Sequence, residues 1–241
     1  PYTRGRERSR QPEDILREVE ALVDEGYVEI TLLGQNVNAY GKDLNCEYKF
    51  ADLLNDLSKT KIKRIRFTTS HPKDLDDETI QVMARRGNIM PHLHLPVQSG
   101  SNTILKKMNR KYTKEEYLEK INKLRKAIPD ISLTTDIIVG FPGETEEDFK
   151  ETLDLVTKAG FEGAYTFIFS PREGTPASKY EDNITSEVKK ERLLILNKLI
   201  NDGFAAGNKR FEGKIVDVLV EGTSDKKEDI MTGYTIHNKL V

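Results

Sequence analysis

Five short segments of the chain combine glycines with neutral amides and hydroxyls, and each follows a run of β-forming residues. They are residues 34–41, 70–72, 98–101, 140–145 and 170–176. Such groups bind ribose hydroxyls, an amino-acid carboxylate or a purine edge, whereas an acid–base hydrolase needs a poised carboxylate or histidine pair. Capping or turn chemistry explains any one serine or glycine equally well. The five segments together favour a binding site for a polar, nucleoside-like ligand.

Helical and β-rich runs alternate around these segments from residue 12 to about residue 200. The hydrophobic spacing predicts strands over residues 28–33, 63–69, 92–97, 131–139 and 164–169. It predicts helices over residues 12–26, 50–59, 76–86, 102–108, 114–127, 145–160 and 185–208. Strands joined by helical crossovers favour a parallel sheet. Because the carboxyl ends of parallel strands meet at one edge, we expect the five segments to converge there.

The predicted strands alternate polar and apolar residues, unlike strands that are buried on both faces. His92 and His94 share a polar face, as do Thr134 and Asp136 on the next strand. The last strand should place Thr166 on that face and its aromatic residues in the core under the helices, namely Tyr165, Phe167 and Phe169. Polar faces lining a common interior predict an open or incomplete barrel that holds a ligand. The alternative, an antiparallel sheet with one solvated face, is disfavoured by the intervening helices.

Composition and charge limit the function classes. A chain of 241 residues accommodates one large α/β domain with a small appendage. It has no apolar run of the ~20 residues that a membrane span needs and does not open with a signal peptide, so we expect a cytoplasmic protein without a membrane partner. Its single cysteine, Cys46, excludes an internal disulfide framework and a cysteine-rich metal site built from this chain alone.

The start of the chain is basic although the net charge is −2. Four arginines fall within residues 4–10. Arginine forks bind phosphate or carboxylate oxygens, so this segment either contacts an RNA backbone or a cofactor carboxylate, or is a solvated basic tail. Both interpretations stay open from the residues alone.

Two other function classes remain in competition with a nucleoside-binding enzyme. The pair His92 and His94, with His71 on the neighbouring strand and Asp136 as a further ligand, could bind zinc in a barrel hydrolase of the amidohydrolase kind. The loop segments fit that class poorly. A non-catalytic RNA-binding module would draw on the basic start and on β-rich residues near the C-terminus.

Six segments that cover nearly the whole chain closely resemble the bacterial tRNA 2-methylthio-N6-isopentenyladenosine synthases, a radical S-adenosylmethionine (SAM) methylthiotransferase family. They are residues 1–10, 31–41, 66–72, 92–101, 136–145 and 167–176. The sequence Gln-Asn-Val-Asn at residues 35–38 favours the tRNA branch over the related enzymes that modify a ribosomal-protein aspartate. The resemblance implies addition of a methylthio group to C2 of N6-isopentenyladenosine next to the anticodon.

The resemblance also implies an architecture. Residues 1–208 would form a partial (β/α) barrel of the radical SAM type that lacks its first strand. Residues 209–241 would begin a small C-terminal β-barrel RNA-binding domain of the TRAM type. The full-length enzyme would use S-adenosyl-L-methionine and two 4Fe-4S clusters, with tRNA, a sulfur donor and an electron donor as partners, and would act as a monomer. The cluster-binding cysteine motif is absent from this chain, so we expect the chain alone to be inactive and assign it no catalytic residue.

Site residues follow from the resemblance as expectations. Gln35 and the pair Gln98 and Ser99 would contact the methionine and ribose parts of the cofactor. The loop from Gly140 to Glu144 would pack against adenine. The full set of expected cofactor-binding residues is Gln35, Asn36, Ser70, Gln98, Ser99, Asp136, Gly140, Gly143 and Arg172. Asp136 and Arg172 would line the cavity wall. Expected substrate-binding residues are His94, Arg4, Arg6 and Arg8, and no residue is expected to bind a metal.

Overall fold

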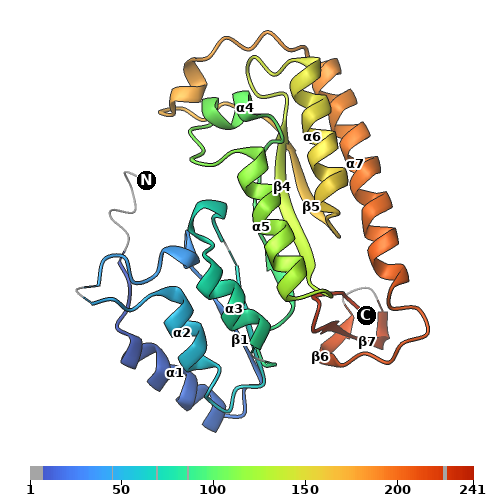
Figure 1. The fold of residues 1–241 in the computed structure, drawn as a ribbon. Coiled ribbons are helices and arrows are strands. Elements are labelled where there is room, and N and C mark those ends of the chain that lie inside the picture. The colour runs from blue at the N-terminus through green and yellow to red at the C-terminus, as the bar shows by residue number, and fades with distance from the viewer. Residues whose placement is uncertain (1–7, 45, 69, 86, 225–226) are drawn as a thin grey trace.

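The computed structural model describes residues 8–44, 46–68, 70–85, 87–224 and 227–241. Five strands alternate with helices along the first two hundred residues (Figure 1). The strands are β1 (Glu29–Leu32), β2 (Arg64–Phe67), β3 (His92–His94), β4 (Ser132–Val139) and β5 (Ala164–Ile168). The helices are α1 (Pro12–Asp24), α2 (Phe50–Leu57), α3 (Asp77–Arg85), α4 (Asn102–Lys107), α5 (Lys114–Ala127), α6 (Glu146–Ala159) and α7 (Ser186–Lys209). The elements predicted from the sequence are therefore confirmed to within a few residues.

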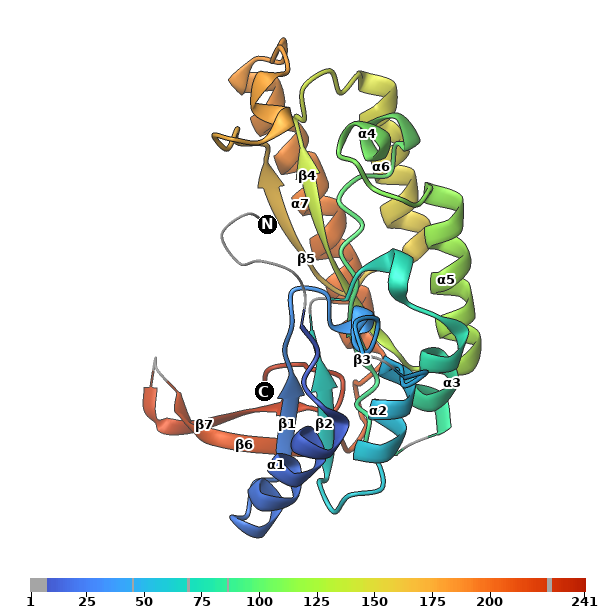
Figure 2. The ribbon, with the colours of Figure 1, turned by 90° about the vertical axis from the view of Figure 1, so that its left-hand side faces the viewer.

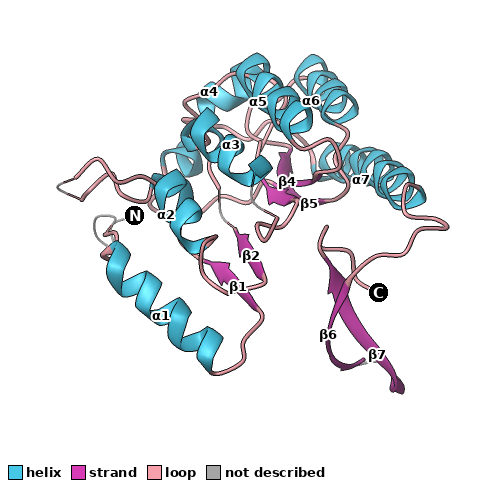
Figure 3. Ribbon diagram, turned by 60° about the horizontal axis from the view of Figure 1, so that its bottom comes forward, coloured by secondary structure: helices cyan, strands magenta, loops and turns pink. Residues whose placement is uncertain are grey.

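The strands pair in parallel as two sheets, β1–β2 and β3–β4–β5. The sheets meet at Ile65, whose N–H donates to the Asn88 carbonyl at 2.7 Å and whose carbonyl accepts from Met90 at 3.0 Å. Helices α2 to α7 lie outside this curved row of strands (Figure 3). This is the open, helix-covered barrel that the strand alternation predicts, and the antiparallel alternative is wrong.

The core lies between the strands and these helices. Alternate residues of β4 that point toward the helices, such as Leu133, Ile137 and Val139, are fully buried. The buried Tyr117 of α5 spans this layer and donates from its hydroxyl to the Leu95 carbonyl at 2.8 Å. Its hydroxyl therefore keeps a hydrogen-bond partner inside an apolar layer. The other face is left open on β5, where Tyr165 is 67% exposed.

The facing of β5 corrects the sequence prediction. Tyr165 is 67% exposed and Phe167 is 51% exposed, so neither is a core residue. Thr166 instead points toward α7, where its hydroxyl donates to Asn197 Oδ1 at 2.5 Å. Because strand side chains alternate with period two, a prediction that is wrong by one residue inverts both faces. The open face of β5 is therefore aromatic.

The C-terminal segment forms an antiparallel hairpin of β6 (Val218–Ser224) and β7 (Lys227–Thr235). It lies near β1 and β2, at the end opposite the carboxyl ends of the strands (Figure 2). One hairpin is too little to identify a small β-barrel, so the RNA-binding domain at residues 209–241 stays a prediction. Within the described ranges, none of the helices has the length and apolarity that crossing a membrane requires.

Candidate functional site

A polar cluster occupies the open face of the β3–β4–β5 sheet. The parallel register places His94 opposite Thr134 and Asp136 opposite Tyr165. His94 Nε2 lies 3.3 Å from Asp136 Oδ1, and its Nδ1 lies 3.0 Å from Thr134 Oγ1. The Tyr165 ring stands edge-on to the His94 imidazole, with centroids 5.9 Å apart. The cluster thus presents an oriented imidazole, a carboxylate and an exposed aromatic ring to a ligand.

His92 completes the cluster on the side nearer the amino end of β3. Its Nε2 lies 3.4 Å from Thr134 Oγ1, so one hydroxyl connects both imidazoles. Burial, followed by the positive charge of Arg66, lowers the pKa of His92 to about 3. The His92 imidazole is therefore neutral at physiological pH and serves as a hydrogen-bonding group.

The loops that follow β1 and β2 carry buried polar groups without partners. Asn36 Nδ2 donates to Asp74 Oδ2 at 2.6 Å, which ties the two loops together. Asn38 is only 5% exposed, yet neither atom of its amide has a hydrogen-bond partner among the residues that the structure describes. The Ser70 hydroxyl, also buried, has none either. Unpaired buried polar groups are rare and costly, so these loops fit a polar ligand that would supply the missing hydrogen bonds.

The segment after β3 is held by main-chain bonds. Gln98 has φ of 72°, a left-handed conformation that glycine adopts more easily. Its N–H donates to the Asp136 carbonyl at 2.8 Å, and its carbonyl accepts from Ile138 at 2.9 Å. Ser99 Oγ lies 3.4 Å from the Thr152 hydroxyl of α6. Gln98 is thereby fixed beside Asp136, whereas the Ser99 side chain contacts the helix layer.

The loop after β4 is anchored to α7. The Gly140 N–H donates to Glu144 Oε1 at 3.1 Å, and the same oxygen accepts from Arg192 at 2.7 Å. Burial raises the pKa of Glu144, and the hydrogen bond from Gly140 and the Arg192 charge oppose that rise. A Cβ atom at Gly140 would lie 2.5 Å from Lys189 Cγ, and one at Gly143 would lie 2.5 Å from Lys107 Nζ. Both glycines, with φ of 68° and 76°, allow this close approach.

The expected site residues divide into three groups. His94, Asp136 and the Gln98 main chain come together on the open face, and Asn36 and Ser70 lie in the loops after β1 and β2. Other side chains are exposed or point elsewhere: Gln35, Arg8 and Arg172 are exposed, and Ser99 faces α6. Arg4 and Arg6 lie outside the described residues.

Sequence reasoning missed four contributors: Asn38, Thr134, Tyr165 and Arg192. The sequence predicts Thr134 on the polar face. That its hydroxyl connects His92 and His94 could be known only from the register between β3 and β4. Arg192 belongs to α7, a helix whose sequence predicts a role in packing. Its ion-pair partner, Glu144, lies 48 residues away in the sequence. The sequence does contain one sign of this role, because Arg192 is a charged residue on the apolar stripe of α7.

The zinc hypothesis gains no support. Among the described residues, no three His, Cys, Asp or Glu side chains come together as metal ligands would. His71 is used elsewhere, since its Nδ1 accepts from the Lys73 N–H at 3.1 Å and its Nε2 lies 3.4 Å from Arg110. Asp136 lies 3.3 Å from His94, but among the described residues it does not form a metal-binding group with the histidine pair on β3.

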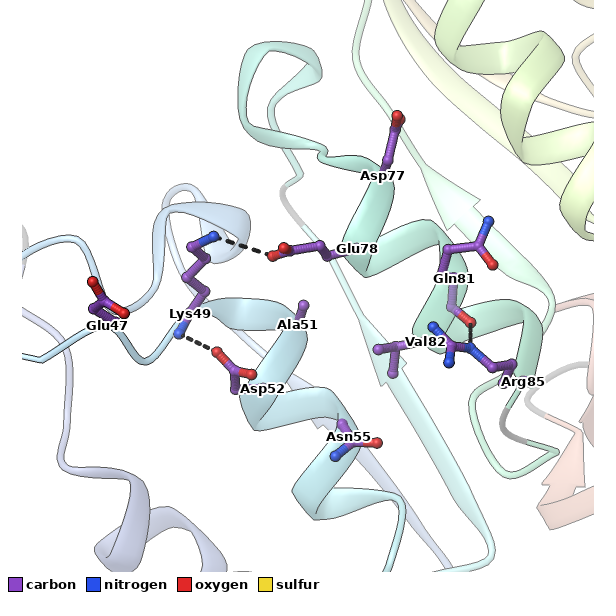
Figure 4. A pocket seen from close by; sticks show the side chains of 10 residues that line it. All are labelled: Glu47, Lys49, Ala51, Asp52, Asn55, Asp77, Glu78, Gln81, Val82 and Arg85. Atoms are coloured by element: carbon purple, nitrogen blue, oxygen red, sulfur yellow. Dashed lines mark hydrogen bonds and ion pairs between the residues drawn. The ribbon is translucent and has the colours of Figure 1, made fainter.

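A groove of about 570 Å³ lies elsewhere, between α2 and α3 on the outer side of the barrel (Figure 4). Its lining is mostly charged and self-paired: Lys49 Nζ lies 3.2 Å from Glu78, and the Lys49 N–H donates to Asp52. It contains none of the residues singled out from the sequence. The open face and the carboxyl-end loops remain the better candidate site.

Comparison with curated proteins gives close relatives over the whole chain. The chain is 62% identical over 242 aligned residues to the tRNA-2-methylthio-N(6)-dimethylallyladenosine synthase of Geobacillus thermodenitrificans. It is 60% identical to the protein of the same name from Bacillus subtilis. Both alignments cover 100% of this chain but only 46% and 48% of the relatives, so the chain spans about half their length.

Solved structures share the fold at low sequence identity. The methyltransferase TsrM from Kitasatospora setae matches 70% of this chain and 33% of its own, with a TM-score of 0.57 and 16% identity. Coproporphyrinogen III oxidase HemN from Escherichia coli matches 80% of this chain and 46% of its own, with a TM-score of 0.53 and 16% identity. Both are described as radical SAM enzymes. The Radical SAM superfamily model matches residues 1–156, and the chain therefore belongs to the radical SAM superfamily.

Proposed function

We propose that this chain is the barrel of a cytoplasmic enzyme that adds a methylthio group to C2 of N6-dimethylallyladenosine in tRNA. The observation that carries the proposal is 62% identity, along the entire chain, to a synthase named for that product. The open polar face supports it, because a base delivered by RNA needs an accessible cavity. A zinc hydrolase lacks a ligand set among the described residues, and a purely RNA-binding module would not need the buried, unpaired groups of the carboxyl-end loops.

The proposed cofactor is S-adenosyl-L-methionine, and the residues present fit it. Asn38 and Ser70 offer buried polar atoms that have no partner within the described ranges, and such atoms suit the amino-acid and ribose groups of this ligand. Two 4Fe-4S clusters belong to the proposal for the full-length protein, and their thiolates must come from outside this chain, which has one cysteine. When bound, these groups supply the radical, methyl and sulfur chemistry.

The chain's own residues would bind and orient. Gln98, Asn36 and Ser70 would contact the cofactor, with Gln35 and Arg172 at the exposed edge. Gly140 and Gly143 would keep their loop close to α7 and α4, so that a purine can pack on the main chain. The Ser99 hydroxyl would fix the turn after β3 from the helix side. These roles hold the reacting carbon in place and exclude water.

The substrate base would lie against the cluster on β3, β4 and β5. His94 would donate or accept a hydrogen bond at the purine edge while Asp136 fixes the ring orientation. Tyr165 would offer a ring for stacking. Arg4, Arg6 and Arg8 would contact the tRNA backbone. A monomer that receives sulfur and electrons from separate donors completes the proposal.

The test is product formation by the full-length protein after anaerobic reconstitution with iron and sulfide. With tRNA carrying N6-dimethylallyladenosine, mass spectrometry should detect the 2-methylthio nucleoside. Asp136→Asn should lower turnover by roughly 10- to 100-fold through loss of one oriented hydrogen-bonding group. Asp154→Asn is the matched control, since Asp154 pairs with Lys158 of the same helix, α6, and is not among the expected site residues. Cleavage of S-adenosylmethionine without any thiolated nucleoside would contradict the proposed substrate.

A further inference from the structure

A strongly basic segment begins in the last turn of α4. Four cations fall within six residues, and we call them the basic rim: Lys106, Lys107, Arg110 and Lys111. The three lysines are exposed and Arg110 is half-buried. Within the described chain none of the four forms an ion pair with a carboxylate. Exposed lysines elsewhere do, as Lys123 does with Asp77 at 3.0 Å. A protein with net charge of −2 therefore concentrates positive charge here, although the Lys107 charge also acts on Asp148.

The basic rim is mounted rigidly on the barrel. Asn109 ends α4 with φ of 58°, and the Arg110 N–H donates back to the Leu105 carbonyl at 2.9 Å. Tyr112, 6% exposed, donates from its hydroxyl to the Val97 carbonyl at 3.0 Å, just beyond β3. The segment is thus fixed to the carboxyl end of a barrel strand. A segment whose main chain is already ordered binds a polyanion with little loss of loop entropy.

The position of the basic rim relates it to the candidate site. Lys107 Nζ lies 3.4 Å from the Gly143 carbonyl, in the loop after β4. Arg110 Nη1 lies 3.4 Å from His71 Nε2, in the loop after β2. Arg110 is only half-buried, so its side chain keeps contact with solvent at this edge. Figure 2 shows α4 at the same end of the molecule as the carboxyl ends of β4 and β5.

We infer that the basic rim binds the phosphate backbone of the RNA whose base enters the open face. This inference rests on the proposed function and adds where the tRNA backbone runs. Lysine and arginine neutralise phosphates independently of sequence, and a guanidinium fork also binds phosphate oxygens directionally. Because the basic rim joins two carboxyl-end loops, phosphates held there would flank a nucleotide turned toward His94 and Tyr165. The surface therefore positions the RNA without reading its sequence.

The test is tRNA binding by the full-length protein over a series of salt concentrations. Lys106→Glu combined with Lys111→Glu should weaken binding roughly tenfold or more at about 0.15 M salt. The slope of log affinity against log salt should fall by about 1.5 to 2. Lys61→Glu combined with Lys63→Glu is the matched control, because these exposed lysines lie at the amino end of β2 and make the same charge change. That variant should bind within about twofold of the wild type.

The outcomes are distinct. Unchanged affinity and salt slope in the Lys106 and Lys111 variant, with wild-type protein binding tRNA, would overturn the inference and leave the proposed function intact. An equal loss in the control variant would also overturn it, since the effect would then be one of total charge. Failure of the wild-type protein to bind tRNA at all would overturn both. Thermal unfolding of each variant checks that folding is unchanged, and Lys→Gln at both positions should reduce the slope in the same direction.

Discussion

The two sheets of the barrel use their polar faces differently. On β2, Arg66 is 8% exposed, and its guanidinium donates to the Thr235 carbonyl at 2.8 Å and the Ile236 carbonyl at 3.2 Å. On β4 and β5, by contrast, the Asp136 side chain is 27% exposed and Tyr165 is 67% exposed. One polar face is thus covered by the chain itself, and the other remains accessible.

The difference separates a structural use of buried charge from a binding use. Arg66 Nε also lies 3.0 Å from Glu29 Oε1, as an ion pair without hydrogen-bond geometry. Arg64 adds a hydrogen bond to the Tyr234 carbonyl at 3.0 Å. These groups stabilise the contact between β2 and residues 234–236 at the end of the C-terminal hairpin. The same alternation of polar and apolar residues on β4 leaves the Asp136 side chain 27% exposed, where a ligand can reach it.

The largest expected effect is on the covered face. Arg66→Ala removes two hydrogen bonds and leaves Glu29 as a largely buried carboxylate without its nearest partner. The free energy of unfolding should fall by roughly 3 kcal/mol, measured by urea denaturation. Arg17→Ala, at a side chain that is 74% exposed, should change it by less than about 0.5 kcal/mol. A loss below about 1 kcal/mol for Arg66→Ala would contradict the structural role given to the buried charge on β2.

An intermediate effect should appear with pH at His92, which lies between the two faces. The unfolded imidazole titrates near 6.5, whereas the folded pKa is lowered to about 3 by burial. Below pH 6.5 the unfolded state therefore binds a proton that the folded state does not, and stability is lost as the pH falls through this window. Between pH 6.5 and about 5 the loss amounts to roughly 2 kcal/mol. Urea denaturation at both pH values should show a shallower dependence for His92→Gln, and parallel curves would contradict the assignment.

The smallest effect is expected on the accessible face. Tyr165→Ala should change the free energy of unfolding by less than about 1 kcal/mol, because a ring that is 67% exposed buries little area. Tyr117→Ala is the reference variant, because removing this fully buried ring should cause a large loss in the free energy of unfolding. Thermal unfolding of both variants gives the comparison. A large destabilisation by Tyr165→Ala would mean that the ring belongs to the core after all.

Much of the fold could be predicted from residue patterns. The Thr145 capping box and Gly160 with φ of 59° delimit α6 as predicted, because caps and left-handed glycines are local. The orientation of β5 was not predictable, since either face of Tyr165, Thr166 and Phe167 could have met a helix. The deciding contact, with Asn197 of α7, is distant in the sequence. Alternation gives the period of a strand but not which side is buried.

The site followed the same rule. His94 and Asp136 were predicted because both lie on clearly alternating strands. Asn38 was missed, because an unpaired buried amide is visible only when all neighbours are placed. The exposure of Arg172 and the facing of Ser99 toward α6 likewise depend on how loops settle against the helix layer.

Arg64 and Arg66 grip the C-terminal segment by the carbonyls of three consecutive residues, 234–236. Every residue type has a main-chain carbonyl, so these hydrogen bonds do not depend on which side chain is present. Substitutions at Tyr234 and Ile236 can therefore accumulate during evolution without loss of the attachment, provided that the backbone path is kept, whereas Thr235 is itself buried. Arg64, Arg66 and Glu29 tolerate fewer substitutions, because all three of these carbonyls accept from the same two guanidinium groups.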